Sequence, residues 1–320
     1  MRVCILGSGL TALTLAKALV NQNIFVDLIS SNKNHKINHS RTIGISKSNF
    51  NYFNRNITNI EKISWKLKKI EIYTDKNKNE KILNFENSDE QLFSIIKNYQ
   101  LFEVLNKNLF KNKYFKKIKS QKKSIKPEKY NLIVNTEYNN IFTKKYFSKK
   151  IEKVYNSSAY TTVINHETIS NQIAVQIFTK IGPLAFLPLS KNKTSIVYSI
   201  YNSKDVDRKK IIHLINQYNI KYKIKKIEKI ENFELKFFNL RSYYHNHILA
   251  FGDLLHRIHP LAGQGFNMTI RDINLFINII KNKIDLGLPL DSSVNYEFEK
   301  NLKHKNYIFS NSIDLVQEFF

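Results

Sequence analysis

The chain has 320 residues, 42% hydrophobic and 12% aromatic, a composition typical of a globular protein with a sizeable core and not of a disordered one. Its formal net charge is +25, but the excess is mostly Lys dispersed among Asn and Ile. Nucleic-acid binders cluster their cations and use Arg, so we expect no nucleic-acid partner. No apolar run reaches the length of a membrane span and no signal peptide precedes the first strand, so we expect a cytoplasmic protein.

The first thirty residues predict a βαβ unit with a GxGxxA turn. Residues 3–6 form an apolar run typical of a parallel strand that is covered on both faces, and residues 24–29 form a second one. Gly7 permits a tight turn, Gly9 lets a pyrophosphate approach the helix N-terminus, and Ala12 allows the helix to pack closely on the strand. This context favours a dinucleotide site; a glycine turn that serves packing alone is the alternative.

Side chains around this unit are less regular. The second strand of such units usually ends in an acid that binds ribose hydroxyls, but the position here is Ser30. Asp27 lies too early in the strand, and a hydroxyl is a weaker partner than a carboxylate. Arg41 precedes the next apolar stretch and either meets a phosphate or cofactor or is simply solvated. Cys4, the one cysteine, lies within an apolar strand pattern and is expected to be a buried thiol.

The rest of the chain predicts alternating strands inserted between two nucleotide-binding halves. Strands are expected over 65–73, 81–85, 130–135, 159–167, 171–179, 182–190, 194–201 and 247–251, and helices over 93–109, over 205–218 and from 258 onward. The Lys-rich stretch 111–129 lacks periodicity and predicts a loop or poorly formed strands. We therefore expect an α/β fold with a Rossmann-like domain (1–62, 92–150, 241–320), an interleaved, mainly antiparallel sheet domain that binds substrate (63–91, 151–240) and a helical C-terminus.

The most distinctive stretch is "FGDLLHRIHPLAGQGFNMTIRD" at residues 251–272. It resembles the second flavin fingerprint of class A flavoprotein monooxygenases, which have the para-hydroxybenzoate hydroxylase fold. The fuller form, GDxxHxxHPLAGQGxNxxxRD, resembles the ubiquinone-biosynthesis hydroxylases in particular. Further segments agree in order: "GSGLTALTLAKAL", "RTIGIS", "IIKNYQL", "GPLAFLPLS" and "YEFEKNLKHKN". The resemblance spans nearly the whole chain.

The resemblance implies FAD as cofactor and NAD(P)H as reductant. Asp253 would accept hydrogen bonds from ribityl hydroxyls, Pro260 would stiffen the turn that faces the flavin ring, and residues 263–265 would bring helix N–H groups to the ring, where negative charge develops on reduction. Arg41 would meet a phosphate or the flavin edge. The full set of expected cofactor-binding residues is Gly7, Gly9, Ala12, Ser30, Arg41, Gly252, Asp253, Pro260, Gly263, Gln264, Gly265, Phe266 and Asn267.

Other residues of the motif are expected to be structural. Asn267 and Asp272 suit a role in fixing the turn and helix, and His256 resembles a structural part of the family's turn. His256 and His259 alone make a poor metal site, so no metal is expected. Because the flavin carries the chemistry, no side chain is assigned acid-base catalysis. A substrate pocket is expected at Leu184, Phe186 and Pro188, which are otherwise plain sheet core.

The chain also departs from the family pattern. The Asp-Gly pair that normally follows the 130–135 strand is replaced by Glu137 and Tyr138, the 111–129 stretch is short, and the chain stops at Phe320, earlier than its relatives. The changes at Ser30, at Glu137 and Tyr138 and in the 111–129 stretch fall on the adenosine side of the cofactor or on the NADPH approach. They indicate a streamlined enzyme, a weak FAD binder or a degenerate paralogue.

The function that this resemblance implies is hydroxylation of the aromatic ring of a polyprenylated ubiquinone precursor, a phenol or quinone, with NAD(P)H and O2. A basic surface favours anionic lipid headgroups, so the protein is expected to be cytoplasmic or peripheral on the inner membrane, near other ubiquinone-biosynthesis proteins. Two alternatives stay open: a catalytically degenerate subunit of a membrane-associated biosynthetic complex, and a flavin reductase of the same fold that does not use O2.

Overall fold

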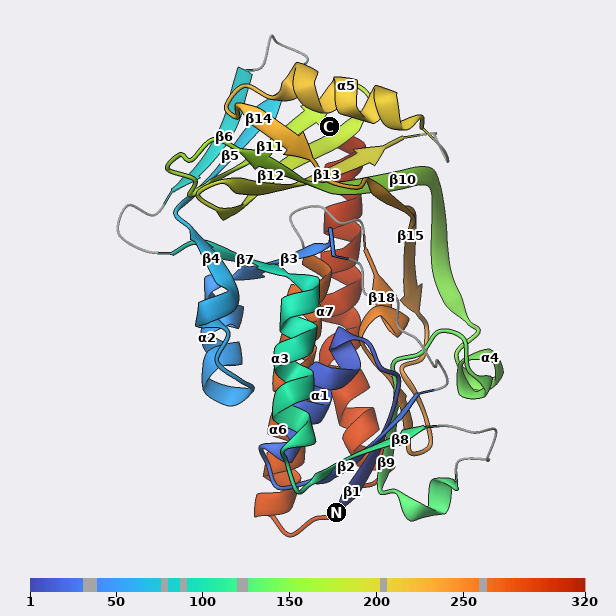
Figure 1. Ribbon diagram of the computed structural model, residues 1–320. Helices are drawn as coiled ribbons and strands as arrows, with labels where there is room; N and C mark the ends of the chain where they lie inside the picture. The colour runs from blue at the N-terminus through green and yellow to red at the C-terminus, as the bar shows by residue number, and fades with distance from the viewer. Residues whose placement is uncertain are drawn as a thin grey trace.

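The computed structural model describes residues 1–30, 39–75, 80–86, 91–119, 126–201, 206–258 and 264–319. Two large sheets lie at opposite ends of the molecule, with helices and a small third sheet between them (Figure 1). The N-terminus lies at the six-stranded end, and the last helix finishes near the nine-stranded sheet. Among the residues described, no helix combines the length and apolar character needed to cross a membrane.

The six-stranded sheet has the order β16-β17-β9-β1-β2-β8. Its strands are β1 (Arg2–Leu6), β2 (Phe25–Ser30), β8 (Phe115–Lys119), β9 (Leu132–Asn135), β16 (Tyr244–His245) and β17 (Ile248–Ala250). All neighbours are parallel except β16 and β17, and the central strands are buried on both faces, as their unbroken apolar runs predict. The Rossmann-like prediction is confirmed. The Lys-rich β8 is an edge strand, where charged side chains block further pairing.

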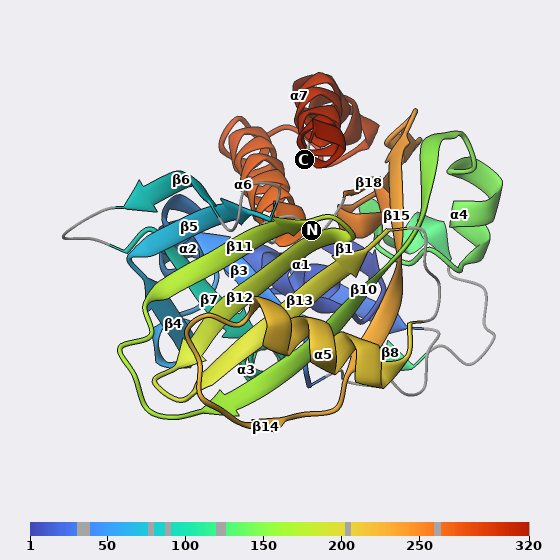
Figure 2. The same cartoon turned by 90° about the horizontal axis from the view of Figure 1, so that it is seen from above.

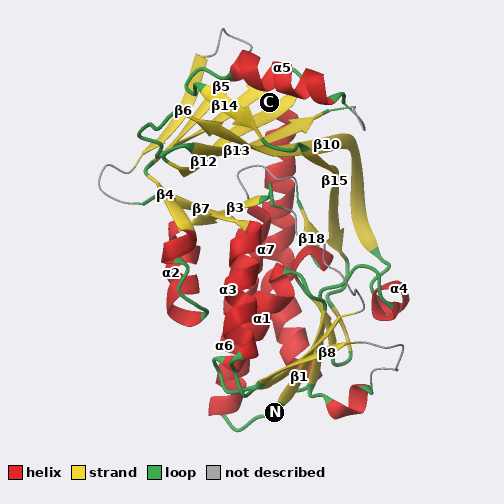
Figure 3. Ribbon diagram, viewed as in Figure 1, coloured by secondary structure: helices red, strands yellow, loops and turns green. Residues whose placement is uncertain are grey.

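The helices of the described chain lie mostly between the two large sheets (Figure 3). They are α1 (Leu10–Val20), α2 (Lys47–Asn56), α3 (Asn98–Phe110), α4 (Ile141–Tyr146), α5 (Arg208–Tyr218), α6 (Gln264–Asp285) and α7 (Ser292–Phe319), with short 3-10 turns η1 (Glu61–Ile63), η2 (Pro127–Lys129) and η3 (Gly252–Leu254). Helix α1 packs against α3 and α6, and α6 packs against α7. The α1 residues Leu13, Leu15 and Leu19 are buried in the largest core cluster.

The nine-stranded sheet runs β18-β15-β10-β13-β12-β11-β5-β6, with β14 paired to β10. Its strands are β5 (Lys69–Thr74), β6 (Glu80–Glu86), β10 (Lys150–His166), β11 (Ile173–Thr179), β12 (Gly182–Ser190), β13 (Lys193–Ile200), β14 (Ile224–Ile227), β15 (Glu231–Leu240) and β18 (His256–Arg257). All pairs are antiparallel except β11 with β5, which confirms the mainly antiparallel prediction. Helix α5 lies on one face (Figure 2) and buries Ile211 and Ile215 there.

A three-stranded sheet, β3 (Thr42–Ser46), β7 (Phe93–Lys97) and β4 (Ser64–Leu67), lies between the two large ones. It corrects two predictions. The single strand expected over 65–73 divides at Lys68, so β4 joins the small sheet and β5 the large one. The helix expected from 93 begins only at Asn98, because Ile95 and Ile96 are buried in a strand that pairs with β3 and β4 on either side. Short apolar runs do not distinguish a strand from a helix turn.

Candidate cofactor site

The turn after β1 leaves the N-terminus of α1 open. Gly7 has a positive φ of 133°, and a Cβ there would overlap the side-chain oxygen of Thr136, so only glycine fits. Its backbone N–H donates to the Ile29 carbonyl at 2.9 Å. Gly9 is the N-cap of α1 and provides no side chain to cap it, and a Cβ at Gly9 would have no other atom within 4 Å. Free N–H groups at a helix start beside open space suit an anion.

The carboxyl end of β2 carries two hydroxyls close together. The Ser30 hydroxyl donates to Ser8 Oγ at 3.1 Å, next to the glycine turn. Asp27 is occupied elsewhere: it is buried, accepts a hydrogen bond from the Tyr130 hydroxyl at 3.0 Å, and lies 3.5 Å from the Arg2 guanidinium. The acid inside the strand therefore does not replace the missing one at its end.

The turn after β9 shows how the altered middle motif is built. Asn135 is fully buried. Its side-chain oxygen Oδ1 accepts from the backbone N–H of Glu137 at 3.0 Å, and its side-chain Nδ2 donates to the Thr143 hydroxyl at 2.7 Å. Tyr138 is half exposed, and its hydroxyl accepts from Lys150 Nζ at 2.7 Å. Its ring lies 5.8 Å from that of Phe238.

Glu137, rather than Tyr138, stands beside the glycine turn. The Glu137 Cγ would lie 3.4 Å from a Cβ built on Gly7. The structure thus places a carboxylate side chain next to the β1–α1 turn, at the position where the sequence suggested a substitute for the family's Asp.

The C-terminal motif contacts the N-terminal glycine helix directly. Gly252 follows β17 with a φ of 64°, and a Cβ there would overlap the methyl group of Thr11 in α1. Ala12, the small residue of the first motif, is completely buried in the same helix. The chain therefore passes α1 with no room for a side chain, and Asp253 follows at the carboxyl end of the sheet with its side chain exposed.

Charged groups from four segments gather around Arg41. Burial lowers the pKa of Arg41. The carboxylates of Asp253 and Glu231 raise it and the Arg257 guanidinium lowers it, so these three groups lie within electrostatic range of Arg41. The guanidinium lies 4.6 Å from the centre of the Phe233 ring. The Arg41 side chain is solvent-exposed, although the surrounding protein partly desolvates its guanidinium. Sequence reasoning named Arg41 and Asp253 but missed the others, although Arg257 lies inside the same motif.

The start of α6 is anchored to the β3–α2 segment. The Asn267 side chain accepts from the backbone N–H of Ser46 at 3.0 Å and donates to the Gly44 carbonyl at 2.9 Å. The Phe266 ring lies 6.5 Å from that of Phe53. The side chains of Asn267 and Phe266 thus position the helix, which is the structural role expected for Asn267.

Gly265 differs from these neighbours. Helix α6 begins at Gln264, and a Cβ at Gly265 would have no other atom within 4 Å, as at Gly9. Within the described part of the chain, nothing therefore covers the helix start on this side. Pro260, Gly263 and His259 lie outside the described residues. In the parts of the chain that are described, no group of three or more His, Cys, Asp and Glu side chains could hold a metal ion.

The residues expected to line a substrate pocket are buried instead. Leu184 and Phe186 belong to the apolar cluster beneath α5, and Pro188, on the same face of β12, is also buried. This corrects the expected placement and matches the sheet-core alternative. Alternate positions face the other way: Leu187 packs with residues of the small sheet, and the hydroxyls of Thr42 in β3 and Ser195 in β13 are 3.0 Å apart. That face looks toward Arg41.

Solved structures share this architecture over almost the whole chain. PqsL of Pseudomonas aeruginosa, a probable FAD-dependent monooxygenase, superposes with a TM-score of 0.76 and 12% identity, covering 99% of this chain and 94% of that one. The p-nitrophenol 4-monooxygenase PnpA of Pseudomonas putida superposes with a TM-score of 0.79 and 12% identity, covering 98% and 87%. The fold is that of the FAD-dependent monooxygenases. At these identities the likeness concerns the fold alone.

Sequence comparison finds relatives that match only about half of the chain. No family model matches the chain. Ubiquinone biosynthesis monooxygenase COQ6 of Caenorhabditis elegans is 25% identical over 212 residues, which are 52% of this chain and 47% of the relative. The 3-demethoxyubiquinol 3-hydroxylase of Escherichia coli is 30% identical over 156 residues, 45% of this chain and 39% of the relative. The chain thus spans less than half the length of these relatives, and it is similar to ubiquinone-biosynthesis monooxygenases in that part.

Proposed function

We propose that this protein is an FAD-dependent monooxygenase that hydroxylates the aromatic ring of a polyprenylated ubiquinone precursor, with NAD(P)H as reductant. The observation that carries the proposal is the close contact of Gly252 with Thr11. It joins the C-terminal motif to the N-terminal glycine helix, so two helix starts with open space beside them belong to one site. The fold shared with FAD-dependent monooxygenases and the relatives named for ubiquinone biosynthesis support the same reading.

The residues present fit FAD. The open start of α1 at Gly9 would receive the pyrophosphate, Ser30 would bond to the ribose, and Asp253 would accept from the ribityl chain. The open start of α6 at Gly265 would stabilise negative charge on the flavin ring, and Arg41 would meet a phosphate or the ring edge. When bound, FAD supplies the redox chemistry that joins NAD(P)H oxidation to activation of O2.

The chain itself would orient the substrate and exclude water. Leu187 and Val197 are partly buried neighbours on adjacent strands of the sheet face that looks toward Arg41, and they offer an apolar surface to an aromatic ring. The charges of Arg41 and Asp253, which lie within electrostatic range of each other, would act on a bound group. We assign no side chain the role of an acid or base.

The finer setting of the reaction is also a proposal. A substrate with a polyprenyl tail leaves a bilayer at a cost of about 0.8 kcal/mol per CH2, so the enzyme would work at a membrane surface. A net charge of +25 favours binding to anionic lipid there. Other ubiquinone-biosynthesis proteins at the same surface would be its partners. Electrostatic attraction weakens with salt. A vesicle affinity that changes neither with the fraction of anionic lipid nor with ionic strength would contradict this proposal.

One experiment tests the reaction and separates it from the two alternatives. The purified protein would be examined for bound yellow flavin, then for NADPH-driven O2 consumption, and its gene for restoring ubiquinone in strains that lack a ring hydroxylase. Flavin, O2 uptake and restored quinone together support the monooxygenase. Flavin without O2 uptake indicates a reductase, and the absence of both flavin and restored quinone indicates a non-catalytic subunit. An Asp253→Ala variant, which keeps the fold but loses the ribityl acceptor, is the matched inactive control.

A further inference from the structure

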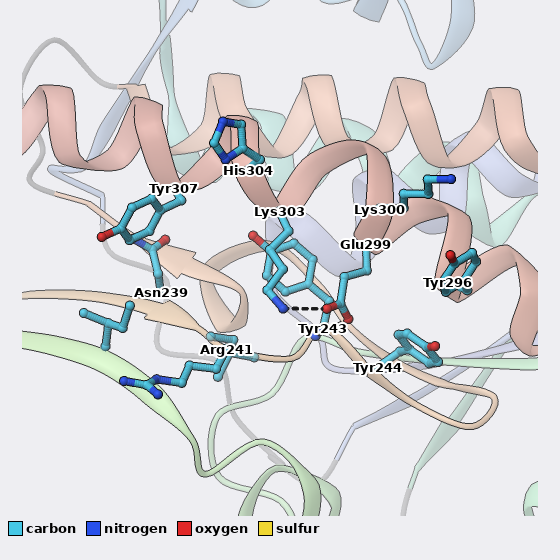
Figure 4. A pocket seen from close by; sticks show the side chains of 12 residues that line it. Asn239, Arg241, Tyr243, Tyr244, Tyr296, Glu299, Lys300, Lys303, His304 and Tyr307 are labelled. Atoms are coloured by element: carbon cyan, nitrogen blue, oxygen red, sulfur yellow. Dashed lines mark hydrogen bonds and ion pairs between the residues drawn. The ribbon is translucent and has the colours of Figure 1, made fainter.

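A concave site lies between α7 and the strands β10 and β15. It is a pocket of about 750 Å³. Figure 4 shows two walls, one from α7 and one from the end of β15 and the loop after it. The lining residues are Ile151, Asn239, Leu240, Arg241, Tyr243, Tyr244, Tyr296, Glu299, Lys300, Lys303, His304 and Tyr307.

The lining is rich in cations that the protein does not neutralise. Among the residues described, the cationic side chains of Arg241 and Lys300 have no ion pair or hydrogen-bond partner, and the imidazole of His304 has none either. The single carboxylate, Glu299, is already used: it accepts from the Tyr243 backbone N–H at 3.0 Å and from Lys303 Nζ at 2.8 Å, the contact dashed in Figure 4. The pocket therefore keeps a net positive charge.

The floor of the pocket contains a buried donor without a partner. Asn239 is only 3% exposed, and its side-chain oxygen Oδ1 accepts from the Ser310 hydroxyl at 3.3 Å. Its side-chain Nδ2 has no acceptor within the described part of the chain. Unsatisfied buried donors are uncommon because each costs about 1–3 kcal/mol. Because Asn239 lines the pocket, its unpaired N–H group adds to the donor character of this wall.

The remaining walls are aromatic and apolar. Tyr296 and Tyr307 are exposed at opposite ends of the α7 wall (Figure 4), and Ile151 is exposed on β10. Tyrosine rings combine a flat apolar face with a hydroxyl donor, so they suit the part of a ligand that lies next to a charged group.

We propose that this pocket binds a phosphate ester that carries an apolar group. The donors outnumber the free acceptors, and an Arg fork with ammonium groups and an amide N–H matches the several oxygens of a phosphate better than the two of a carboxylate. The aromatic and aliphatic walls take the apolar group. A phospholipid headgroup and a free phosphate ester share this chemistry. The site is distinct from the cofactor site, because none of its lining residues belongs to the glycine turns.

Calorimetry with the full-length protein tests this, with hexyl phosphate as the probe and inorganic phosphate and hexyl glucoside as comparisons. We expect hexyl phosphate to bind more tightly than either. The double variant Arg241→Gln with Lys300→Gln should weaken hexyl phosphate by about tenfold or more, which corresponds to about 1.4 kcal/mol. The matched control, Lys225→Gln with Lys226→Gln, removes two exposed cations from β14 and should leave binding unchanged.

The outcomes are separable. Equal affinity for inorganic phosphate and hexyl phosphate would overturn the role of the apolar walls, and equal binding by both double variants would overturn the site. Vesicles of phosphatidic acid in phosphatidylcholine then identify the source. Vesicle binding that is lost only in the Arg241/Lys300 variant supports a lipid headgroup, whereas variant-sensitive hexyl phosphate binding without it supports a free phosphate ester. Neither result depends on whether FAD binds.

Discussion

His256 Nε2 and Asp272 Oδ2 lie 2.7 Å apart, and both side chains are almost completely buried. The pair connects β18 to α6, so a buried polar contact holds the two ends of the 252–272 motif together. Arg271 adds a longer contact of 3.7 Å to the other oxygen of Asp272. His256 therefore has a structural contact, in keeping with the role that the resemblance suggested.

We expect Asp272→Leu to lower the free energy of unfolding by about 3–5 kcal/mol, because it leaves the buried His256 without its partner. The double variant His256→Leu with Asp272→Leu should recover part of this loss, since it removes both polar groups together. Urea denaturation measures each value. Asp285→Asn, an exposed change at the end of the same helix, is the control and should stay within about 0.5 kcal/mol. A double variant as unstable as the single one would contradict the pairing.

The buried thiol of Cys4 should make stability depend on alkaline pH. Burial, with a smaller contribution from Asp27, raises the pKa of Cys4 from its ordinary value of 9.0 to about 12. The unfolded thiol therefore loses its proton first, so this contribution is complete below pH 9 and is lost as the pH rises toward 12. The difference in unfolding free energy between the protein and Cys4→Ala, measured at pH 8 and pH 10.5, should shrink at the higher pH.

Thiol labelling provides an independent check of the same group. The thiolate is the reactive form, so native Cys4 should resist a disulfide reagent at pH 8 and react fully in urea. Because the chain has one cysteine, the signal is unambiguous. Rapid labelling of the native protein would show that Cys4 is not buried as described.

The elements that sequence predicted well are those with strong local signals. The first βαβ unit combines unbroken apolar strands, a glycine turn and helical spacing within thirty residues, and each feature requires the same structure. The division at Lys68 had no such signal: β4 and β5 read as one alternating run, and only their partners, β7 for one and β6 and β11 for the other, separate them.

The site shows the same limit. Alternation along β12 indicates that Leu184 and Ala185 face opposite ways, but it does not say which face meets α5 and which meets the cofactor side. Glu231 and Phe233 reach Arg41 only because β15 pairs with β10 far along the chain, so no local pattern could have named them. The glycines, in contrast, carry a local signal, because Gly7 and Gly252 adopt positive φ angles that favour glycine at those two positions.

The four glycines of the site should separate folding from cofactor binding. Gly7→Ala and Gly252→Ala place a side chain at positive φ against Thr136 and Thr11, so both should destabilise the fold by about 1–3 kcal/mol or more. Gly9→Val and Gly265→Val enter open space and should leave the unfolding midpoint nearly unchanged while removing FAD. Thermal melts of the flavin-free proteins and flavin content after dialysis measure the two effects. Full flavin retention in both Val variants would mean that FAD does not lie against these turns.

Any flavin that Gly265→Val retains should also have a lower reduction potential. A helix N-terminus close to the ring stabilises the anionic reduced form, and a branched side chain at Gly265 would hold the ring away from it. Potentiometric titration of the reconstituted variant measures the shift. An unchanged potential would place the ring elsewhere.

Restoring an acid at the end of β2 should strengthen FAD binding. Ser30 lies beside Ser8 and the glycine turn, where its hydroxyl is a neutral partner for a ribose hydroxyl, and Asp27 is held by Arg2 and Tyr130. A charge-assisted hydrogen bond is stronger by roughly 1 kcal/mol or more, so Ser30→Glu should lower the FAD dissociation constant about five- to tenfold. Ser312→Glu, which adds the same charge on exposed α7, should have no effect. Fluorescence titration of the flavin-free proteins gives the constants. If Ser30→Glu binds FAD no more tightly than Ser312→Glu, the ribose does not lie at the end of β2, and the adenosine half of the cofactor must follow another path from the α1 turn.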